Sequence, residues 1–567
     1  MEYKWTVLTN TMFGAIMASL NMNILMISLP TIFRGLGIDP FAPGEFTVLL
    51  WVLMGYSIVL ATILVTFGRI SDIYGRTRMY TIGYIIFTIA SVLLSIIPDN
   101  SGNTGAYLLI CLRMVQAVGG GFLMVNSAAL LTDAFPYNER GKALGLNQIS
   151  FIIGSLFGLI AGGLLAGYNW HLVFIVNVPF AILGTLWSIF KLKETRKRME
   201  VPLDIYGNVT LAVSLILISL GFTYVLVPYG NSQMGWGNPW VIASFILGIL
   251  FMIIFVYVEK RVKYPLFKLS LFKNRPFAFG NISLFLSSLG RGAVMFLVMI
   301  WLQGVYLPLH GYSYSETPFW AGIYLLPMML GTVLLGPISG ILTDKYGART
   351  LSTIGMIIMG VSLFLLTLLP YNFNLLEFEL IIFINGLGGG LFASPNTTAI
   401  MNALPPEDRG TGNGMRMTLN NIGSTISMAI FFSIAITIFS EYLPSSIYNN
   451  ALSMGIPSSL AHALSNAIPP SGALFGAFLG VDPISALPQS LINTLPASIV
   501  KALEDPTFLP NAIGPSFMIG LQYALYIAGA LSFVGAIFSA LMGKRYVHEE
   551  HAENLKIESP KIRGAEK

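Results

Sequence analysis

The chain has few charged residues for its size. Only 10% of its 567 residues are charged and 55% are hydrophobic, whereas a typical soluble protein has about 25% charged residues. The 26 acidic and 31 basic side chains are too few to cover the surface of so large a soluble body. A soluble globular protein is therefore excluded, and a polytopic membrane protein is indicated.

Thiols and nucleotide-binding motifs are also lacking. The single cysteine, Cys111, excludes an internal disulfide and any zinc or iron–sulfur site built from thiolates. The pairs Gly141-Lys142 and Gly543-Lys544 are not followed by Ser or Thr and lack the spacing of a phosphate-binding loop. We therefore expect no metal, no cofactor, no ATP binding and no enzymatic activity.

Long apolar runs, by contrast, are abundant. A window of about 20 residues, the length that crosses a bilayer core of about 30 Å, finds fourteen of them. The predicted spans are residues 7 to 29, 46 to 67, 79 to 97, 105 to 132, 142 to 167, 171 to 190, 207 to 228, 239 to 258, 276 to 305, 319 to 341, 349 to 370, 376 to 402, 411 to 440 and 516 to 542.

Basic residues fall almost entirely on one side of this map. Only Arg34 and Lys501 fall on the other side, while Arg113, Arg291 and Arg416 lie within spans. Because basic loops stay in the cytoplasm, both termini are predicted to be cytoplasmic, in a multi-pass protein of the cell membrane. The pI of about 9.0 then reflects topology and not a nucleic-acid partner.

The sequence repeats itself. A Gly-Asp-Tyr-Gly pattern at 68 to 75 returns in register at 340 to 347, and the three glycines at 119 to 121 return at 388 to 390. Two six-helix halves are therefore predicted, at residues 1–198 and 276–543, with two inserted spans in residues 199–275. Repeated halves that meet at a site near the bilayer midplane are a transporter architecture.

These motifs resemble those of the major facilitator superfamily, specifically its fourteen-helix branch of drug:proton antiporters. The resemblance implies an all-α fold with 14 transmembrane helices and a motif that closes the cytoplasmic side. Gly75 permits the sharp turn of this motif, and Asp72 can face the positive N-terminal end of the thirteenth span. The implied gating residues are Gly68, Asp72, Gly75 and Arg76, with Gly340, Asp344 and Gly347 as the second copy.

Polar side chains inside the spans are candidates for a central cavity. An arginine in hydrocarbon costs about 2.5 kcal/mol or more, so Arg113 should face a cavity or a partner, unless it snorkels to the membrane surface. Asn21 stands where the antiporter branch has an aspartate, its usual candidate for proton coupling. The expected substrate and coupling cavity comprises Asn21, Arg113, Gln116, Arg291 and Gln303.

The fifth span contains a glycine stripe, which resembles an antiporter motif but has Leu159 in place of the motif's proline. Such a stripe lets another helix approach closely, so it could seal the two halves, act as a bend, or only pack. The stripe consists of Gly154, Gly158, Gly162 and Gly163.

Titratable groups suited to carry protons are scarce. No Asp, Glu or His lies deep in a predicted span. Proton carriage would then use rim carboxylates such as Glu45, Asp133 and Glu316, use His171 or His310, or not occur.

We therefore expect a secondary active transporter that works by alternating access and exports amphipathic or drug-like molecules in exchange for protons. The first alternative is a transporter or exchanger of organic anions or lipid-like metabolites without conventional proton coupling. The second is a membrane sensor or scaffold that does not transport. The expected partners are the lipid bilayer, a small-molecule substrate and protons, with no nucleic acid and no ATP, and the chain is expected to be a monomer.

A long loop and the C-terminal tail also lie outside the predicted spans. Residues 441–515 form a long extracytoplasmic loop, in which short amphipathic helices, for instance around residues 484 to 503, are expected to lie over the outer mouth. This loop is either a lid, a partner-binding segment or a variable connection. The tail, residues 544–567, mixes both charges and is expected to be solvated.

Overall fold

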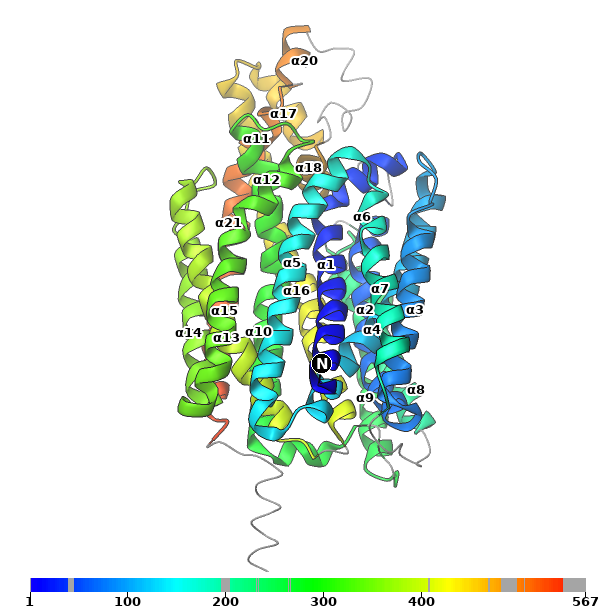
Figure 1. Cartoon of the computed structure of the whole chain (residues 1–567). Coiled ribbons are helices and arrows are strands. Elements are labelled where there is room, and N and C mark those ends of the chain that lie inside the picture. The colour runs from blue at the N-terminus through cyan, green and yellow to red at the C-terminus, as the bar shows by residue number, and fades with distance from the viewer. Residues whose placement is uncertain are drawn as a thin grey trace, which may run out of the picture.

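The apolar runs form a bundle of long helices (Figure 1). The computed structural model describes residues 2–38, 45–194, 204–230, 232, 234–263, 265, 267–405, 408–467, 470–480, 497–503 and 505–543. Within these residues, 14 helices are long and apolar enough to cross a membrane, which confirms the predicted spans. The predicted tail lies outside the described residues.

The first half begins at the N-terminus and contains six spans. Gly37, with a φ of 71°, ends the first helix in the left-handed conformation, and Gly75, with a φ of 110°, makes the turn between the second and third. The helices are α1 (Tyr3–Leu36), α2 (Glu45–Tyr74), α3 (Arg76–Leu94), α4 (Gly102–Ala134), α5 (Tyr137–Tyr168), α6 (Leu172–Ile175) and α7 (Asn177–Lys191).

The inserted segment consists of α8 (Ile205–Val225), the short η1 (Gly235–Gly237) and α9 (Pro239–Glu259). Helix α8 packs against α2 of the first half and against α16 of the second. At the junction with the second half, the Trp236 indole donates to the Ser433 hydroxyl at 2.9 Å. The inserted pair therefore lies beside both halves.

The second half repeats the packing of the first. Helix α4 packs against α2 and α3, and α15 packs in the same way against α13 and α14, as the sequence repeat predicts. The elements are η2 (Leu269–Lys273), α10 (Arg275–Ile300), the π-helical turn η3 (Trp301–Tyr306), α11 (Leu307–Leu309), α12 (Thr317–Tyr324), α13 (Leu326–Tyr346), α14 (Ala348–Leu366), α15 (Leu375–Asn402), α16 (Arg409–Ser453) and α21 (Phe508–Ala540).

Several helices extend beyond the predicted span ends, and α16 extends furthest. The thirteenth span was expected to end at residue 440, but α16 continues to Ser453. Its last turns are held by Leu443, Ile447 and Ala451, which are buried and recur every four residues, so that one helical face remains in the apolar core.

Short helices follow α16, as expected for the long loop. They are α17 (Ser458–Ala467), α18 (Pro470–Leu479) and α20 (Ala497–Leu503). Of the helical stretch expected around residues 484 to 503, only residues 497–503 belong to the described part of the chain. We call the end of the bundle with these helices the loop end, and the end where α1 begins and α21 ends the terminal end (Figure 1).

Candidate functional site

At the terminal end, Asp72 near the end of α2 contacts the start of α16. One carboxylate oxygen of Asp72 accepts from the Thr411 backbone N–H and from the Thr411 hydroxyl, both at 3.3 Å. The N-cap residue of α16, Asp408, makes no side-chain capping bond. A carboxylate from the first half therefore caps a helix of the second half, in the contact that the sequence predicts.

Arg76 extends this contact into a buried ion-pair network. Its guanidinium is 2% exposed, donates from Nε to Asp72 at 2.8 Å and pairs with Asp133 at the end of α4. Arg409 of the second half lies 3.9 Å from the other Asp133 oxygen. Asp133 was expected to be a rim proton carrier; it lies among the predicted gating residues, and its proton-carrying role stays a prediction.

The two halves touch along their backbones at this end. A Cβ atom on Gly68 of α2 would lie 2.6 Å from the Gly410 carbonyl oxygen, and one on Gly414 would lie 2.8 Å from the Leu64 carbonyl oxygen. Only glycine permits so close an approach. Helices α2 and α16 therefore close the terminal end between them.

Asn413 is a contact residue that sequence reasoning missed. Its amide donates to the Val125 carbonyl of α4 at 2.8 Å, and its oxygen accepts from Arg416 Nε at 3.0 Å. Arg416 also donates to the Thr397 hydroxyl at 3.3 Å. The sequence flags Arg416 as a charge within a span, but Asn413 carries no motif beyond its two glycine neighbours.

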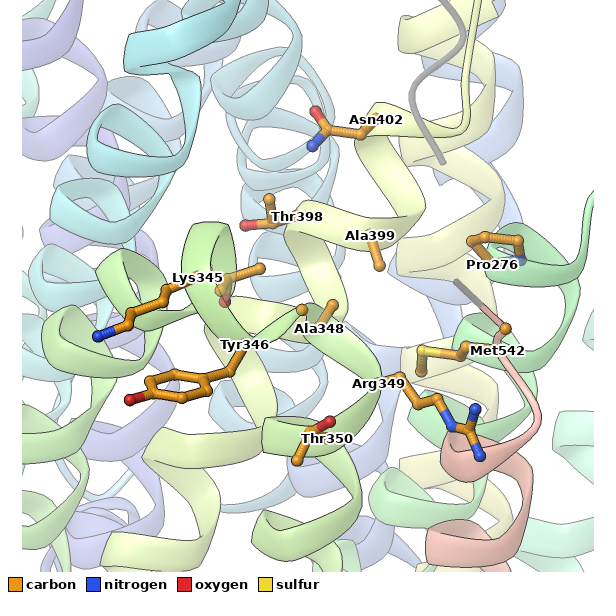
Figure 2. Close-up of a pocket in the computed structure, with 13 residues that line it drawn as sticks. Pro276, Lys345, Tyr346, Ala348, Arg349, Thr350, Thr398, Ala399, Asn402 and Met542 are labelled. Carbon is orange, nitrogen blue, oxygen red and sulfur yellow. The ribbon is translucent and has the colours of Figure 1, made fainter. Parts of the chain in front are cut away.

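The second copy of the gating motif is arranged differently. Gly340 is buried and Gly347, with a φ of 77°, makes the turn into α14, but the Asp344 side chain lies outside the described residues. A cavity of about 330 Å³ lies beside this turn (Figure 2). The first copy has a buried arginine at the matching place.

Within the first half, Arg113 is held by polar and aromatic partners. It donates to Gln116 at 2.8 Å, and Gln116 in turn donates to the Ser91 hydroxyl of α3 at 2.9 Å. The Arg113 guanidinium lies 4.5 Å from the centre of the Tyr56 ring and is 3% exposed. The alternative of an arginine that snorkels to the membrane surface does not fit this burial.

Asn21 is the least satisfied polar group of this region. It is fully buried beside the Tyr56 hydroxyl, its nearest polar neighbour, and neither amide atom makes a hydrogen bond of ordinary geometry among the described residues. Buried amides are nearly always hydrogen-bonded, so an unpaired one calls for water, a ligand or another conformation. Tyr56 contacts both Asn21 and Arg113, and it is a residue that sequence reasoning did not single out.

Arg291 and Gln303 occupy two further places. The Arg291 side chain is exposed, although it lies deep in α10, and its guanidinium would be 3.9 Å from a Cβ atom on Gly389 of α15. Gln303 is fully buried in η3, with no hydrogen-bond partner for its amide in the described chain. The five predicted cavity residues thus fall in three places.

The glycine stripe packs mainly within the first half. A Cβ atom on Gly154 or Gly158 would lie 2.3 Å or 2.7 Å from a carbonyl oxygen of α1, and one on Gly162 would lie 2.3 Å from Ile27. Only Gly163 faces the second half, where a Cβ atom would lie 2.3 Å from the Phe319 Cα atom. Gly154, Gly158 and Gly162 therefore do not seal the halves, because the neighbour of this face of α5 is α1.

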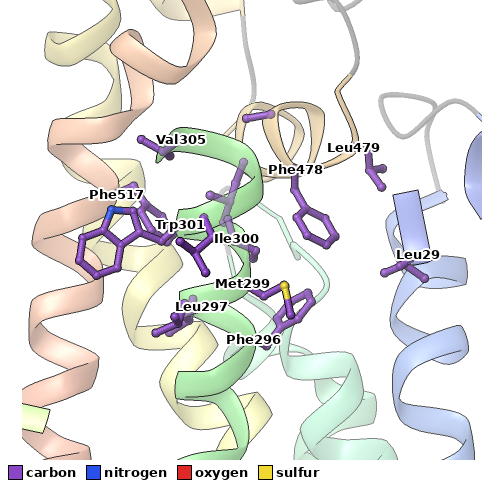
Figure 3. Packing of buried hydrophobic residues seen from close by; sticks show 14 of the residues in the cluster. Leu29, Phe296, Leu297, Met299, Ile300, Trp301, Val305, Phe478, Leu479 and Phe517 are labelled. Carbon is purple, nitrogen blue, oxygen red and sulfur yellow. The ribbon is translucent and has the colours of Figure 1, made fainter. Parts of the chain in front are cut away.

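The loop end is covered by α18. This helix contacts α1 of the first half and η3, α16 and α21 of the second. Its Phe478 is 1% exposed and packs edge-on against Phe296 of α10, with 5.8 Å between ring centres. Figure 3 shows Phe478 and Leu479 between α10 and Leu29 of α1. One helix of the long loop is thus wedged between the halves at the loop end, and the extracytoplasmic position of this loop stays a prediction.

The two other rim carboxylates predicted to carry protons are Glu316 and Glu45. Glu316 is exposed and accepts from the Ser313 hydroxyl at 2.7 Å, in the turn that precedes α12. The Glu45 side chain lies outside the described residues. Their expected part in proton carriage stays a prediction.

Two repeated six-helix halves that touch at both ends and enclose buried polar side chains define a polytopic membrane transporter. Comparison with known sequences agrees: the family model of the Major Facilitator Superfamily matches residues 11–262 and 207–428. The chain belongs to the Major Facilitator Superfamily, and it is a transporter and not an enzyme.

Several characterised relatives carry transporter names. The chain is 32% identical to the riboflavin transporter RibZ of Clostridioides difficile over 438 residues, 76% of this chain and 88% of the relative. It is 29% identical to multidrug resistance protein 3 of Bacillus subtilis, covering 77% of this chain and 80% of that protein. It is 25% identical to the multidrug transporter protein MdtP of Bacillus subtilis, covering 96% and 94%.

Solved structures show the same fold. The human organic anion transporter MFSD10 (TETRAN) superposes with a TM-score of 0.54 at 15% sequence identity, over 86% of this chain and 99% of that chain. At this level of identity the likeness concerns the fold alone.

Proposed function

We propose that the protein exports amphipathic, drug-like small molecules from the cell by alternating access, in exchange for protons. In this proposal both termini of the protein are cytoplasmic. The observation that carries the proposal is the pair of contacts between the halves, one at each end, with unpaired buried amides between them. A transporter with two such closures can release either one in turn. The multidrug names of two relatives support the substrate class.

A second candidate is the transport of organic anions or lipid-like metabolites without conventional proton coupling. The charges deep in the described spans are positive, at Arg113 and Arg291, and Asn21 is neutral where the antiporter branch has a carboxylate. A positive interior favours an anionic group on the substrate and disfavours permanently cationic drugs.

Transport into inverted membrane vesicles distinguishes these candidates. A lipophilic cation, a lipophilic anion and a neutral amphipathic dye are each offered with and without an imposed proton gradient. Drug export with proton exchange predicts gradient-dependent uptake of the neutral dye. The second candidate predicts gradient-independent uptake of the anion, lost in Arg113→Ala. If wild type moves none of the three probes, both proposals are wrong for these substrate classes.

Asn21→Asp tests the role of the missing carboxylate. An aspartate at position 21 would lie beside Tyr56, and the Tyr56 ring makes a cation–π contact with the Arg113 guanidinium. We expect it to increase uptake of the cation and to add pH dependence, with Asn21→Gln as the uncharged control. Equal effects of both substitutions would assign the change to packing and not to charge.

A further inference from the structure

The polar cluster around Arg113 contains several buried atoms that make no hydrogen bond among the described residues. They are both amide atoms of Asn21, the Tyr56 hydroxyl oxygen and Arg113 Nε. The three side chains come from α1, α2 and α4, and each is at most 3% exposed. Because buried polar atoms are nearly always hydrogen-bonded, so many unpaired atoms in one place indicate a bound water or ion.

The same cluster contains a positive charge whose printed partners are neutral. The Arg113 guanidinium donates to the Gln116 amide oxygen at 2.8 Å and lies 4.5 Å from the centre of the Tyr56 ring. Neither partner has a negative charge. A guanidinium buried in a membrane-spanning helix is strongly unfavourable unless an anion lies close to it.

The helices around the cluster offer no carboxylate to this guanidinium. Helices α1 and α3 contain no Asp or Glu, and the acidic residues of α2 and α4, which are Glu45, Asp72 and Asp133, lie near helix ends. Asp72 and Asp133 are already paired with Arg76. Glu45 lies 11 residues from Tyr56 along α2, and at 1.5 Å per residue this is about 16 Å, beyond the reach of its side chain. These four helices therefore leave the positive charge of Arg113 without a counter-ion.

The unpaired atoms favour an anion over a water molecule. Asn21 Nδ2 and Arg113 Nε can only donate, and Asn21 Oδ1, the one atom that can only accept, lies beside the Tyr56 hydroxyl. Two donors and the guanidinium charge then remain for a ligand. A water molecule would bring no negative charge. The ligand must also be small, because the three side chains are buried and a Cβ atom on Gly120 would lie 2.5 Å from the Tyr56 hydroxyl oxygen.

We propose that Asn21 and Arg113, with Tyr56 beside them, bind a chloride ion within the first half. The ion supplies the negative charge that the surrounding helices do not supply, and its hydrogen bonds to charged and neutral donors join α1 to α4. A carboxylate at position 21 would take over this role and make the ion unnecessary. The site does not depend on what the protein transports.

Chloride binding is measured on the purified full chain in nanodiscs, without a transported substrate. Chloride is replaced stepwise by gluconate at constant ionic strength, so that screening of surface charges does not change. Because a ligand that binds only the folded state stabilises it, the melting temperature should rise with chloride and then saturate. Retention of radioactive chloride gives a direct count of bound ions. Equal melting temperatures in chloride and gluconate, with no retained chloride, overturn the proposal.

Two variants test the assigned side chains. Asn21→Asp places a fixed negative charge in the cluster, so its melting temperature should no longer respond to chloride and should be as high in gluconate as in chloride. Arg113→Gln removes the positive charge and should weaken chloride binding by at least about tenfold. Should Arg113→Gln fail to fold, as shown by its elution on size exclusion, Asn21→Asp still decides the test.

Each variant has a matched control. Asn23→Asp adds a carboxylate two positions further along α1, where the Asn23 amide donates to the Ser155 hydroxyl of α5 at 3.1 Å. Arg261→Gln removes an exposed cation outside the cluster. Both should keep the chloride response of the wild type.

The controls decide whether the ion lies at this cluster. Equal loss of the response in Asn21→Asp and Asn23→Asp would mean a general effect of negative charge in α1, and the proposal would be wrong. A full response that remains in Asn21→Asp would place the ion elsewhere, which also overturns it. Since no transported substrate is used, failure of the transport proposal would leave these results unchanged.

Discussion

The two ends of the molecule are closed by different chemistry. At the terminal end, Asp72, Arg76 and Asp133 form a buried ion-pair network that reaches Thr411 of the other half. At the loop end, the apolar helix α18 is wedged between α1 and η3, with Phe478 in the core. Charges are sensitive to the loss of one partner, whereas an apolar wedge can be released stepwise as its buried area is reduced.

Because of this contrast, a substitution should disrupt the two ends in different ways. Removal of one charge from a buried network leaves another charge uncompensated, so a single substitution affects several helices at once. Truncation of a buried aromatic ring leaves a cavity whose cost depends on how well the surroundings collapse. Substitutions at the two ends should therefore differ in size and in which end becomes accessible.

The largest effect is expected from Arg76→Ala. It leaves Asp72 and Asp133 close together without their shared cation, and breaking a buried pair costs about 3–5 kcal/mol. We expect a clearly lower melting temperature in detergent and loss of transport. The control is the double variant Arg76→Ala/Asp133→Asn, which has the pair of residues found at the matching positions of the second half.

That double variant should recover much of the lost stability, because the second half is folded with Ala348 and Asn402 at those positions. If it is as unstable as Arg76→Ala alone, the loss comes from the missing guanidinium contacts and not from uncompensated charge. In that case the two ends do not differ in the way proposed.

The next effect in size is expected from Phe478→Ala at the loop end. Loss of a buried phenylalanine costs about 3 kcal/mol or more in a protein core. We expect α18 to separate from Phe296, and a cysteine at Leu29 to react faster with a membrane-impermeant maleimide, in a Cys111→Ser background. Reactivity at the terminal end should not change. Faster reaction at both ends would mean general loosening and not release of one closure.

Much of the contact at the terminal end could be predicted from the sequence, whereas little of the contact at the loop end could. The contact of Asp72 with the start of α16 could be predicted because a motif places a carboxylate at a helix end, and helix N-termini attract carboxylates. The wedge formed by α18 could not be derived in detail, because its apolar residues do not specify which helices they contact. Gln116 follows Arg113 by three residues, a spacing that puts the two side chains on one face of α4, so this pair could be predicted from the sequence.

Other features depend on packing between distant segments. The glycine stripe shows that some helix comes close to α5, but only the fold shows that it is α1. The bond from Asn413 to a backbone carbonyl of α4 joins residues that are distant in sequence, without a motif at either one. Tyr56 pairs with Arg113 across two helices, and an aromatic residue in a span has too many possible neighbours for this to be predicted.

The smallest of the three effects, and the sharpest test of the comparison, is expected from Asp72→Asn. The amide keeps the size of the carboxylate but loses the charge that faces Thr411 at the start of α16. Arg76 keeps Asp133 as its ion-pair partner, so this variant leaves no buried charge of the network uncompensated, unlike Arg76→Ala. A charged group at a helix terminus stabilises by up to about 2 kcal/mol, so loss of part of that shifts the population of the open terminal end by about tenfold. A cysteine at Ser394, which lies 3.9 Å from a Cβ atom on Gly145 between the halves, should react with an impermeant maleimide about tenfold faster, whereas a cysteine at Leu29 should not.

The matched control is Glu194→Gln, which removes a carboxylate from the start of α3 within the first half and should change neither rate. Unchanged reactivity at Ser394 together with normal transport would mean that Asp72 only marks topology, and that the terminal end is held by its glycine contacts and not by charge.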